Sequence, residues 1–454
     1  MESYSKQKYK KKVEEIFKRF PSVQKVPFGE AYKPGMEHIE RFCSGLGDPQ
    51  RKYRTIHVAG TNGKGSVANM LAAVLVSSGL KVGLYTSPHI VDFRERMRIG
   101  SELVSEEYVW DFLCRHEEEM DRLDLSFFEI TTGMAFKWFA DMEVDVAVIE
   151  TGLGGRLDST NVIVPDLSVV TNIALDHCSI LGSTLEAIAF EKAGIFKEGV
   201  PALVGEYLPE TRPVFERKAA ETGSTLTFAE DAIPSLWYRS EAILKKMDLR
   251  GEYQKKNLRT VLAAIDILKD IPFYSSLADA AAVETAVSRA ASIMGFHGRW
   301  ERLSLHPFII ADIGHNPAAL KENFSQLRKM RENGECSSLI VVYAVMADKD
   351  LDGIMPLMPE DATYIFTNPE IHRALPESEL TSRYKAFCSA EGRPVNRIYE
   401  AETVRKALSM AITLAKQTSR KTDSSRAAFP LIFIGGSTYL VSEALQILKS
   451  LQGF

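Results

Sequence analysis

A glycine-rich turn with one lysine and one hydroxyl has the residue types of a phosphate-binding loop. The turn follows an apolar run at residues 56–59 and comprises Gly60, Thr61, Asn62, Gly63, Lys64, Gly65 and Ser66. Glycines let backbone N–H groups approach an anion, the N-terminus of a following helix adds partial positive charge, and the lysine adds a full charge. We therefore predict that these seven residues bind a phosphorylated ligand.

The turn departs from the common P-loop pattern at two positions. That pattern requires glycine at position 58 and Ser or Thr at position 65, where this chain has Val58 and Gly65. The hydroxyl comes one residue later, at Ser66. A plain strand–turn–helix connection is the alternative, and it is disfavoured because such turns rarely also place Lys and Ser at the start of the helix.

Two further side chains with metal-binding chemistry follow apolar runs. Glu150 ends the run 144–149, and a carboxylate at a buried strand end beside a phosphate loop suits nucleotide-bound Mg²⁺. A strand-end carboxylate with no ligand is the alternative. His177 follows the next run, but Mg²⁺ prefers oxygen, so the residue type alone favours a core or hydrogen-bonding histidine. A dinucleotide-binding pattern in the segment after Glu150 would need glycine at position 157, where this chain has Leu157, so that type of site is disfavoured.

Short β-rich runs that alternate with helical patterns predict the elements that position these side chains. The predicted strands are residues 55–59, 81–86, 145–150, 167–172 and 201–205, and the predicted helices include residues 67–78, 106–120, 131–142 and 184–196. This alternation is typical of an α/β fold with a mostly parallel, doubly wound sheet. Ligands bind such sheets at the carboxyl ends of the strands, so the loops that carry the candidate residues should converge.

The pattern begins again after an alanine-rich helical stretch at residues 277–292. Residues 308–312, 338–345, 363–367 and 431–434 read as a second set of buried strands. We therefore expect a first domain at residues 1–296 and a smaller, Rossmann-like α/β domain at residues 297–454. Residues 418–426, rich in Ser, Lys and Arg, are expected to form a surface loop.

Composition restricts the class of protein. The 454 residues include no apolar run long enough for a membrane span, and the net charge of −5 opposes nonspecific nucleic-acid binding. Five widely separated cysteines indicate a reducing compartment. The lysine-rich start has no apolar signal core and predicts an amphipathic helix that buries Val13, Ile16, Phe17 and Phe20. We expect a cytoplasmic enzyme, a monomer with neither a nucleic-acid nor a membrane partner.

The loop at residues 60–66 resembles the GTNGKGS loop of the folylpolyglutamate and dihydrofolate synthases and, more distantly, of the Mur ligases. Further elements resemble those of this family in the same order: residues 87–89 (SPH), 95–97 (ERM), 127–131 (FFEIT), 175–177 (LDH), 191–195 (EKAGI), 251–257 (GEYQKKN), 298–301 (GRWE), 312–317 (DIGHNP) and 435–440 (GGSTYL). The chain is identified on these residues as similar to the bifunctional bacterial type.

The resemblance implies a metal site. It implies two Mg²⁺ ions held by Ser66, Glu150, His177 and Lys192, and it reverses the preference for a non-ligand His177. In the family the lysine corresponding to Lys192 is commonly carbamylated by CO₂, which converts a cation into an anionic oxygen ligand. Without the resemblance, Lys192 reads as a solvated helix lysine balanced by Glu191.

The resemblance also implies substrate contacts. Asn257, Arg299 and Asp312 would contact ATP, His315 and Ser437 would contact glutamate, Arg96 would hold a glutamate carboxylate, and Ser87 and Phe127 would contribute to substrate binding. Alternatives remain: a surface arginine paired with Glu95 or nearby acids for Arg96, packing for Phe127, and a simple strand-to-helix turn for residues 312–317. Ile313 and Gly314 replace the family's Gly and Ala, and residues 28–35 occupy the place of its pterin-side loop without the usual arginine.

The implied activity is ATP-dependent ligation of L-glutamate to a dihydropteroate or reduced-folate carboxylate through an acyl phosphate. Lys64, Lys192, Asp312 and His315 would be the catalytic residues. Another Mur-type amide ligase would share this chemistry. A P-loop kinase or GTPase, or an ATP-binding switch without enzymatic activity, fits less well, since neither needs the Arg96 and His315 elements.

Overall fold

The apolar runs form two sheets, each in its own compact unit. The computed structural model describes residues 4–19, 35–395, 397–419 and 429–452. One unit comprises residues 1–248 and 254–296, and the other comprises residues 249–253 and 297–454. The short segment 249–253, which the sequence placed in the first domain, thus belongs to the second unit. Residues 28–34 of the pterin-side loop, residues 420–426 of the expected surface loop, and Phe20 lie outside the described residues.

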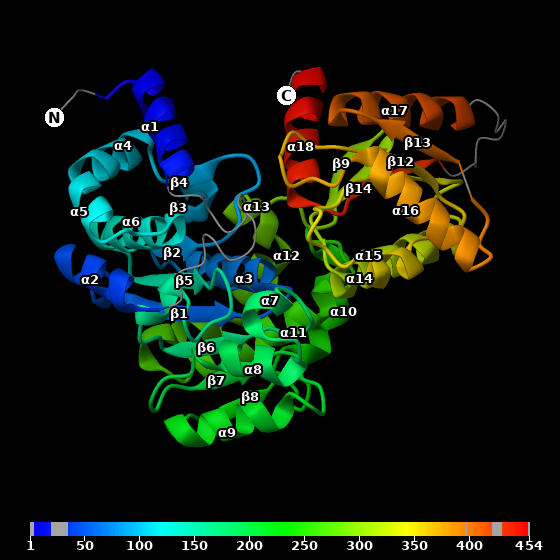
Figure 1. Cartoon of the computed structure of the whole chain (residues 1–454). Helices are drawn as coiled ribbons and strands as arrows, with labels where there is room; N and C mark the ends of the chain where they lie inside the picture. Colours follow the sequence, from blue (N-terminus) through cyan, green and yellow to red (C-terminus); the bar gives the residue numbers. More distant parts are fainter. Residues whose placement is uncertain (1–3, 20–34, 396, 420–428, 453–454) are drawn as a thin grey trace. The chain divides into compact units, whose positions relative to one another are not determined.

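The first unit contains a mostly parallel sheet (Figure 1). Its strands are β1 (Arg54–Ala59), β2 (Val82–Tyr85), β3 (Met97–Ile99), β4 (Glu102–Leu103), β5 (Val146–Glu150), β6 (Leu167–Val170), β7 (Ala202–Val204) and β8 (Leu226–Phe228). They are ordered β4-β3-β2-β5-β1-β6-β7-β8, and β3 pairs antiparallel with both β2 and β4, whereas the other described pairs of this sheet are parallel. The five predicted strands are confirmed as β1, β2, β5, β6 and β7. The other three are too short for their periodicity to show.

Helices cover both faces of this sheet. They are α1 (Lys6–Arg19), α2 (Glu37–Gly45), α3 (Lys64–Ser77), α4 (Glu106–Arg115), α5 (Glu117–Arg122), α6 (Phe127–Asp141), α7 (Cys178–Leu181), α8 (Leu185–Ala193), α9 (Arg212–Thr222), α10 (Ser240–Lys246), α11 (Gln254–Leu268), α12 (Ala280–Ser288) and α13 (Ala290–Met294). The helix predicted at residues 106–120 is interrupted at His116, and the alanine-rich stretch is interrupted at Arg289. Of the residues predicted to be buried in α1, Ile16 is buried, Val13 is only partly buried, and the side chain of Phe17 lies outside what the structure describes.

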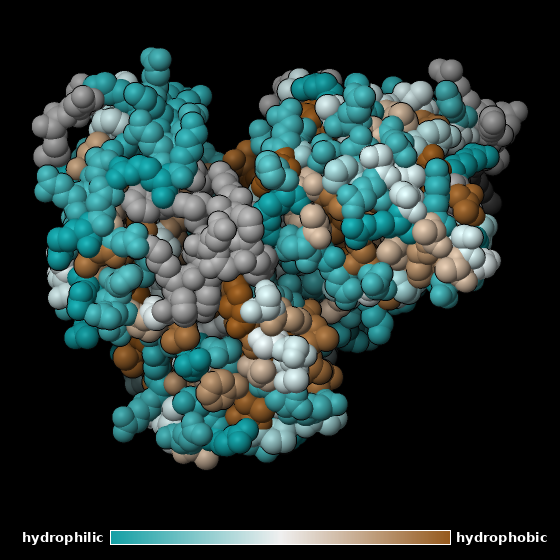
Figure 2. Space-filling view, in the orientation of Figure 1, coloured by the Kyte–Doolittle hydropathy of each residue, from teal (hydrophilic) through white to brown (hydrophobic). Residues whose placement is uncertain are grey.

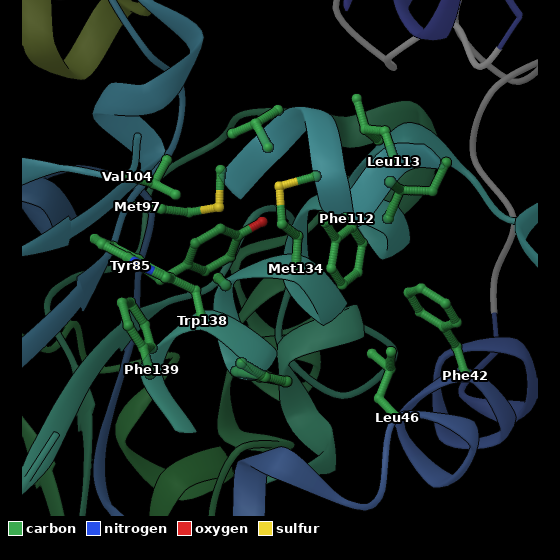
Figure 3. Packing of buried hydrophobic residues seen from close by; sticks show 14 of the residues in the cluster. Phe42, Leu46, Tyr85, Met97, Val104, Phe112, Leu113, Met134, Trp138 and Phe139 are labelled. Atoms are coloured by element: carbon green, nitrogen blue, oxygen red, sulfur yellow. The ribbon is translucent and has the colours of Figure 1, made fainter. Parts of the chain in front are cut away.

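Side-chain alternation along β5 divides the core between two layers. Ala147 and Ile149 belong to a cluster with α6, which Figure 3 shows around Tyr85, Met134 and Trp138. Successive strand residues point to opposite faces, so Val146 and Val148 face the other layer, where α3 contacts β5. β5 is buried on both sides, as central parallel strands usually are.

The second unit repeats this architecture with fewer strands. Its strands are β9 (Glu301–Leu305), β10 (Phe308–Asp312), β11 (Leu339–Tyr343), β12 (Thr363–Thr367), β13 (Ile398–Ala401) and β14 (Leu431–Gly435), in the order β13-β12-β11-β14-β10-β9. Its helices are α14 (Pro317–Glu332), α15 (Leu351–Ile354), α16 (Glu377–Ala390), α17 (Val404–Ser419) and α18 (Thr438–Gln452). β9 alone among the described strands of this sheet is antiparallel to its neighbour. The predicted α/β class is confirmed in both units.

The exposed surface is mixed in character. Hydrophilic residues cover much of the face in Figure 2, with hydrophobic residues scattered among them. No helix in the described part of the chain is both long enough and apolar enough to cross a membrane. The five cysteines are free thiols, and Cys43, Cys336 and Cys388 are buried.

Candidate active site

The predicted phosphate loop lies between the end of β1 and the start of α3. Gly60 and Gly63 have φ angles of 147° and 84°, which side chains with a Cβ rarely adopt. A Cβ at Gly60 would collide with the Thr171 hydroxyl, and one at Gly63 would collide with the side-chain amide oxygen Oδ1 of Asn257. Both glycines are therefore required by conformation and by space. Ser66, in the first turn of α3, is 1% exposed.

Two lysines converge on the carbonyl oxygen of Gly60. Lys64 Nζ donates to it at 3.1 Å, and Lys192 Nζ, from α8, donates at 2.8 Å. Lys192 is 4% exposed, so the reading as a solvated helix lysine is wrong. Burial, and to a lesser extent the charge of Lys64, lower the pKa of Lys192 to about 7, while Asp176 and Asp158 oppose the shift. A substantial part of Lys192 is therefore a neutral amine near neutral pH.

The segment after β6 braces the phosphate loop. Asn62 N donates to Asn172 Oδ1 at 2.9 Å, and Thr171 Oγ1 donates to Asn62 O at 2.6 Å. Thr61 N donates to Asn172 O at 2.9 Å. The parallel pairing of Ala59 with Val170 places these two strand ends side by side. Neither Thr171 nor Asn172 was predicted as a site residue, although polar side chains directly after a buried strand were a usable signal.

Glu150 stands at the same sheet edge as the phosphate loop. It is the last residue of β5, pairs in register with Val58 of β1, and is 3% exposed. Its Oε2 accepts a hydrogen bond from Ser87 N at 3.2 Å, so Ser87 and Glu150 are adjacent. A buried carboxylate at this edge is costly unless it is hydrogen-bonded or metal-bound.

His177 has an unusual backbone conformation. Its φ and ψ are 53° and 36°, the left-handed region, at the residue that precedes α7. The side chain is 32% exposed, and its backbone N–H donates to Asp176 Oδ1 at 2.9 Å. Such conformations cost free energy in residues other than glycine and gather at functional sites. His177 is therefore not a fully buried core histidine, whereas the hydrogen-bonding histidine that its residue type also favoured stays open.

The oxygen donors at this edge suit a nucleotide-bound divalent ion. In the described residues, no three His, Cys, Asp or Glu side chains gather into a metal site of their own. The Glu150 carboxylate and the Ser66 hydroxyl follow neighbouring strands, β5 and β1. Mg²⁺ commonly binds to one or two protein oxygens together with substrate phosphates and water. The donor set fits this mode, in which the nucleotide supplies the remaining ligands.

The N-terminus of α11 contacts the phosphate loop. Gln254 Nε2 donates to Ser66 Oγ at 3.2 Å, and Asn257 Nδ2 donates to Gln254 Oε1 at 2.8 Å. Both side chains are buried. Gln254 was not among the predicted site residues. Its position three residues before Asn257, on the same face of a helix, was the available signal.

Arg96 forms a second cluster in the first unit. It is 3% exposed, its Nε donates to His89 Nδ1 at 2.9 Å, and its guanidinium lies 5.3 Å from the centre of the Phe127 ring. The Glu95 carboxylate instead accepts hydrogen bonds from the backbone N–H groups of Ile90 and Asp92, at 2.7 and 2.8 Å. The alternative of a surface arginine paired with Glu95 is therefore wrong. Phe127 is buried against Arg96, so its packing in the core is compatible with a place beside the predicted site residue.

In the second unit, Asp312 organises the edge of the sheet. Its Oδ2 accepts hydrogen bonds from Trp300 N at 2.8 Å and Tyr253 Oη at 2.7 Å. Its Oδ1 accepts from Gly314 N and Asn323 Nδ2, both at 2.8 Å. The carboxylate thus accepts four hydrogen bonds, close to its full capacity. This geometry favours a role for Asp312 in fixing the turns around it.

The other predicted residues of the second unit belong to neighbouring turns. His315 Nδ1 lies 3.1 Å from Ile313 O, and Arg299 Nη1 donates to Gly298 O at 3.3 Å. Asp312 pairs in register with Gly435, which places the turn of Ser437 at the same edge. The predicted residues therefore form one group around the phosphate loop and one around Arg96 in the first unit, and a third group at the edge of the sheet in the second unit.

The buried position of Lys192 predicts how stability depends on pH. The unfolded chain binds a proton at this lysine up to about pH 10.5, whereas the folded protein loses it near pH 7. Stability therefore rises with pH between these values, because the unfolded state binds more protons. In CO₂-depleted buffer, the free energy of unfolding should increase from pH 7 to 10 by a few kcal/mol more in the wild type than in Lys192→Met, at about 1.4 kcal/mol per pKa unit. A pH-independent difference in urea titrations would contradict this.

Comparisons with known proteins agree with this arrangement. The sequence matches the Mur ligase middle domain at residues 58–232 and the Mur ligase glutamate ligase domain at residues 298–420. Folylpolyglutamate synthase of Lacticaseibacillus casei is 35% identical over 363 residues, covering 73% of this chain and 81% of that protein.

Solved structures extend the likeness to nearly the whole chain. Mycobacterium tuberculosis folylpolyglutamate synthase complexed with ADP has a TM-score of 0.80 and 26% identity, covering 97% of this chain and 98% of that one. A bifunctional folylpolyglutamate synthase/dihydrofolate synthase with Mn, AMPPNP and L-glutamate bound has a TM-score of 0.74 and 25% identity, covering 92% and 95%. With its Mur ligase domains and its phosphate loop beside Glu150 and Lys192, this chain belongs to the folylpolyglutamate synthase/dihydrofolate synthase family of the Mur ligase superfamily.

Proposed function

We propose that this protein ligates L-glutamate to the carboxylate of dihydropteroate or a reduced folate, with hydrolysis of ATP to ADP and phosphate. The observation that carries the proposal is the convergence of Lys64 and Lys192 on the Gly60 carbonyl of the phosphate loop. Family membership and the names of the relatives supply the substrate class.

The reaction has two steps. A substrate carboxylate oxygen attacks the γ-phosphorus, the bond to the β-phosphate oxygen breaks, and an acyl phosphate and ADP form. The glutamate amine, after losing a proton, then attacks the acyl carbon, and the carbon–oxygen bond to phosphate breaks. Lys64 and the loop N–H groups would hold the β- and γ-phosphates during the first step.

We propose that Ser66 and Glu150 hold Mg²⁺ with the nucleotide phosphates, and that His177 and Lys192 serve a second ion. When bound, the metal offsets negative charge on the phosphates. Lys192 can take part as an oxygen ligand only after carbamylation, in which the neutral amine attacks CO₂ and loses a proton. Its lowered pKa and its position at the Gly60 carbonyl support this modification.

We assign the remaining residues to binding. Asn257 and Arg299 would contact ATP, with Asp312 near the nucleotide through the turns that it fixes. His315 and Ser437 would contact glutamate, Ser87 and Phe127 would line the acceptor side, and Arg96 would hold a glutamate carboxylate. The buried Arg96 guanidinium supports an anionic ligand there, since a planar donor fork suits a carboxylate.

We further propose that the protein is a cytoplasmic monomer that acts on small molecules. A net charge of −5 is in keeping with a monomer, and sedimentation would test the oligomeric state.

Phosphate release with ATP and glutamate, measured separately with dihydropteroate and with a reduced folate, tests the proposal. Stimulation by one or both acceptors is expected, together with a glutamylated product in the mass spectrum. No response to either acceptor would overturn the assignment, and a response to a nucleotide-sugar peptide instead would identify a different Mur-type ligase.

Gly63→Ala tests the phosphate loop. The left-handed backbone at residue 63 and the collision with Asn257 should raise KM for ATP about tenfold, because the conformation alone costs about 1–2 kcal/mol. Gly79→Ala is a matched control, since Gly79 has a φ of 91° but no atom within 4 Å of its added Cβ. Steady-state kinetics and thermal unfolding of both variants separate the effect of the left-handed backbone, which both positions share, from the effect of the collision, which only residue 63 has. An equal change in KM for Gly79→Ala would contradict the assignment.

A further inference from the structure

The segment 249–253 is held by the second unit. Glu252 N donates to Gln326 Oε1 of α14 at 2.8 Å, and Gln326 Nε2 donates to Arg250 O at 3.3 Å. Tyr253 then donates its hydroxyl to Asp312 at 2.7 Å. These contacts fix the segment on the elements that carry the turn of His315.

The next residue belongs to the first unit. Gln254 is the first residue of α11, is 0% exposed, and donates to the Ser66 hydroxyl at 3.2 Å. Two consecutive side chains therefore make their contacts in different units. The Tyr253 side chain ends on Asp312, and the Gln254 side chain ends on the phosphate loop.

We propose that Tyr253 is a positioning residue that holds the Asp312 carboxylate, and that the Tyr253–Gln254 pair passes nucleotide binding at Ser66 to the turns of Trp300 and His315. This inference rests on the proposed function, because it assumes that nucleotide binds at the phosphate loop and glutamate near His315.

Trp300 shows why the orientation of Asp312 matters. It has a φ of 46°, a left-handed conformation that is costly for a bulky residue, and its N–H donates to Asp312 Oδ2. Such strain persists only where the surroundings hold it in place. The same oxygen accepts the Tyr253 hydroxyl, so loss of that hydroxyl weakens the restraint on Trp300 and on the adjacent Arg299. Gly314 N, which donates to Asp312 Oδ1, extends the restraint to His315.

Covalent geometry provides the connection. Consecutive Cα atoms are separated by a fixed distance of about 3.8 Å, so on this proposal a shift of Gln254 moves Tyr253 to the extent that the backbone dihedral angles between them do not absorb it. Gln254 is buried and is also tied to Asn257, which leaves it little freedom to absorb a movement of Ser66 by itself. A change at Ser66 on nucleotide binding is therefore passed along the backbone.

Hydrogen exchange tests the positioning role without any substrate. In Tyr253→Phe, the amides of Trp300 and Gly314 should exchange about tenfold faster, because one hydrogen bond to a charged group is lost from their shared acceptor. Tyr274→Phe is the matched control, since Tyr274 donates to Asp166 at the same 2.7 Å in the first unit. That control should leave both amides unchanged. Unchanged exchange of Trp300 and Gly314 in Tyr253→Phe would overturn the positioning role.

Nucleotide binding tests the connection. Mg-AMPPNP should slow exchange of the Trp300 and Gly314 amides in the wild type and should fail to do so in Gln254→Leu at concentrations that saturate that variant. Equal protection in both proteins would overturn the connection. In turnover assays, Tyr253→Phe should lower kcat about tenfold with KM for ATP within about twofold, whereas Tyr274→Phe should change neither. If the wild type neither binds Mg-AMPPNP nor ligates glutamate, the proposed function itself fails, while exchange in unliganded Tyr253→Phe still tests the positioning role.

Discussion

Replacing Lys192 with alanine should lower kcat for folate-dependent phosphate release at least about 100-fold. That is the upper end of the range for loss of a residue that only supports a metal ligand from outside. The Lys192 amine donates to the Gly60 carbonyl oxygen, beside which the phosphates of ATP are expected. Lys64 donates to the same oxygen, but its side chain cannot supply the anionic oxygens of a carbamate. Steady-state kinetics at saturating ATP would measure the effect.

A short carboxylic acid such as acetate should partly restore activity to Lys192→Ala, since it can supply the missing anionic oxygens. Lys197→Ala is the matched control: Lys197 also lies in the first unit, has a pKa lowered by burial, and donates to the backbone carbonyl of Asn161 at 2.8 Å. It should retain activity within about threefold, as expected for a residue outside the site. Full activity of Lys192→Ala, with no effect of acetate, would exclude the carbamylated-lysine model.

The modification itself has a spectroscopic readout. With ¹³C-bicarbonate, the wild type should give a carbamate carbonyl signal that Lys192→Ala lacks. Only the neutral amine attacks CO₂, and the pKa of Lys192 is lowered to about 7. The fraction of neutral Lys192 amine that can react should therefore increase as pH rises from 6 to 8. A signal of equal intensity in Lys192→Ala would assign the carbamate to another amine.

Features that depend on neighbouring strands could be predicted from the sequence. The runs that became β1, β5 and β6 are mostly apolar, which indicates central parallel strands, and parallel strands end at a common edge. This reasoning places the phosphate loop, Glu150 and the segment that leads to His177 together, and the register of the strands agrees. Gly60 and Gly63 were predictable for a different reason, since glycine is the residue type that readily adopts the positive φ angles of this loop.

Contacts between distant segments could not be predicted in this way. Lys192 and Gly60 are separated by 132 positions, and a lysine in a helix with Glu191 beside it looks solvated until its burial is known. The Tyr253–Asp312 hydrogen bond depends on five residues that pack with the second unit although the chain then returns to the first. The break at His116 and the short β3–β4 pair depend on tertiary packing that no local periodicity reports.

Glu150→Gln should lower kcat at least about 100-fold and raise the Mg²⁺ concentration needed for half-maximal activity. Glutamine keeps the size of the side chain and an oxygen that can accept the Ser87 N–H, so the loop at residue 87 should retain its shape. What is lost is the negative charge that a divalent ion requires at the end of β5. The effect should therefore appear in the metal titration and in kcat, with little change in the thermal unfolding temperature.

Glu129→Gln is the control that separates loss of a proposed metal ligand from loss of any buried carboxylate. Glu129 is 2% exposed and accepts Ser126 N at 2.7 Å at the start of α6, so it matches Glu150 in burial and in its backbone hydrogen bond. This capping contact supports the helix, and its change to glutamine should lower stability by about 1 kcal/mol without altering the Mg²⁺ requirement. If Glu150→Gln shows the same profile as Glu129→Gln, with an unchanged metal titration, then Glu150 supports the fold of the sheet edge and the ion is held by other groups.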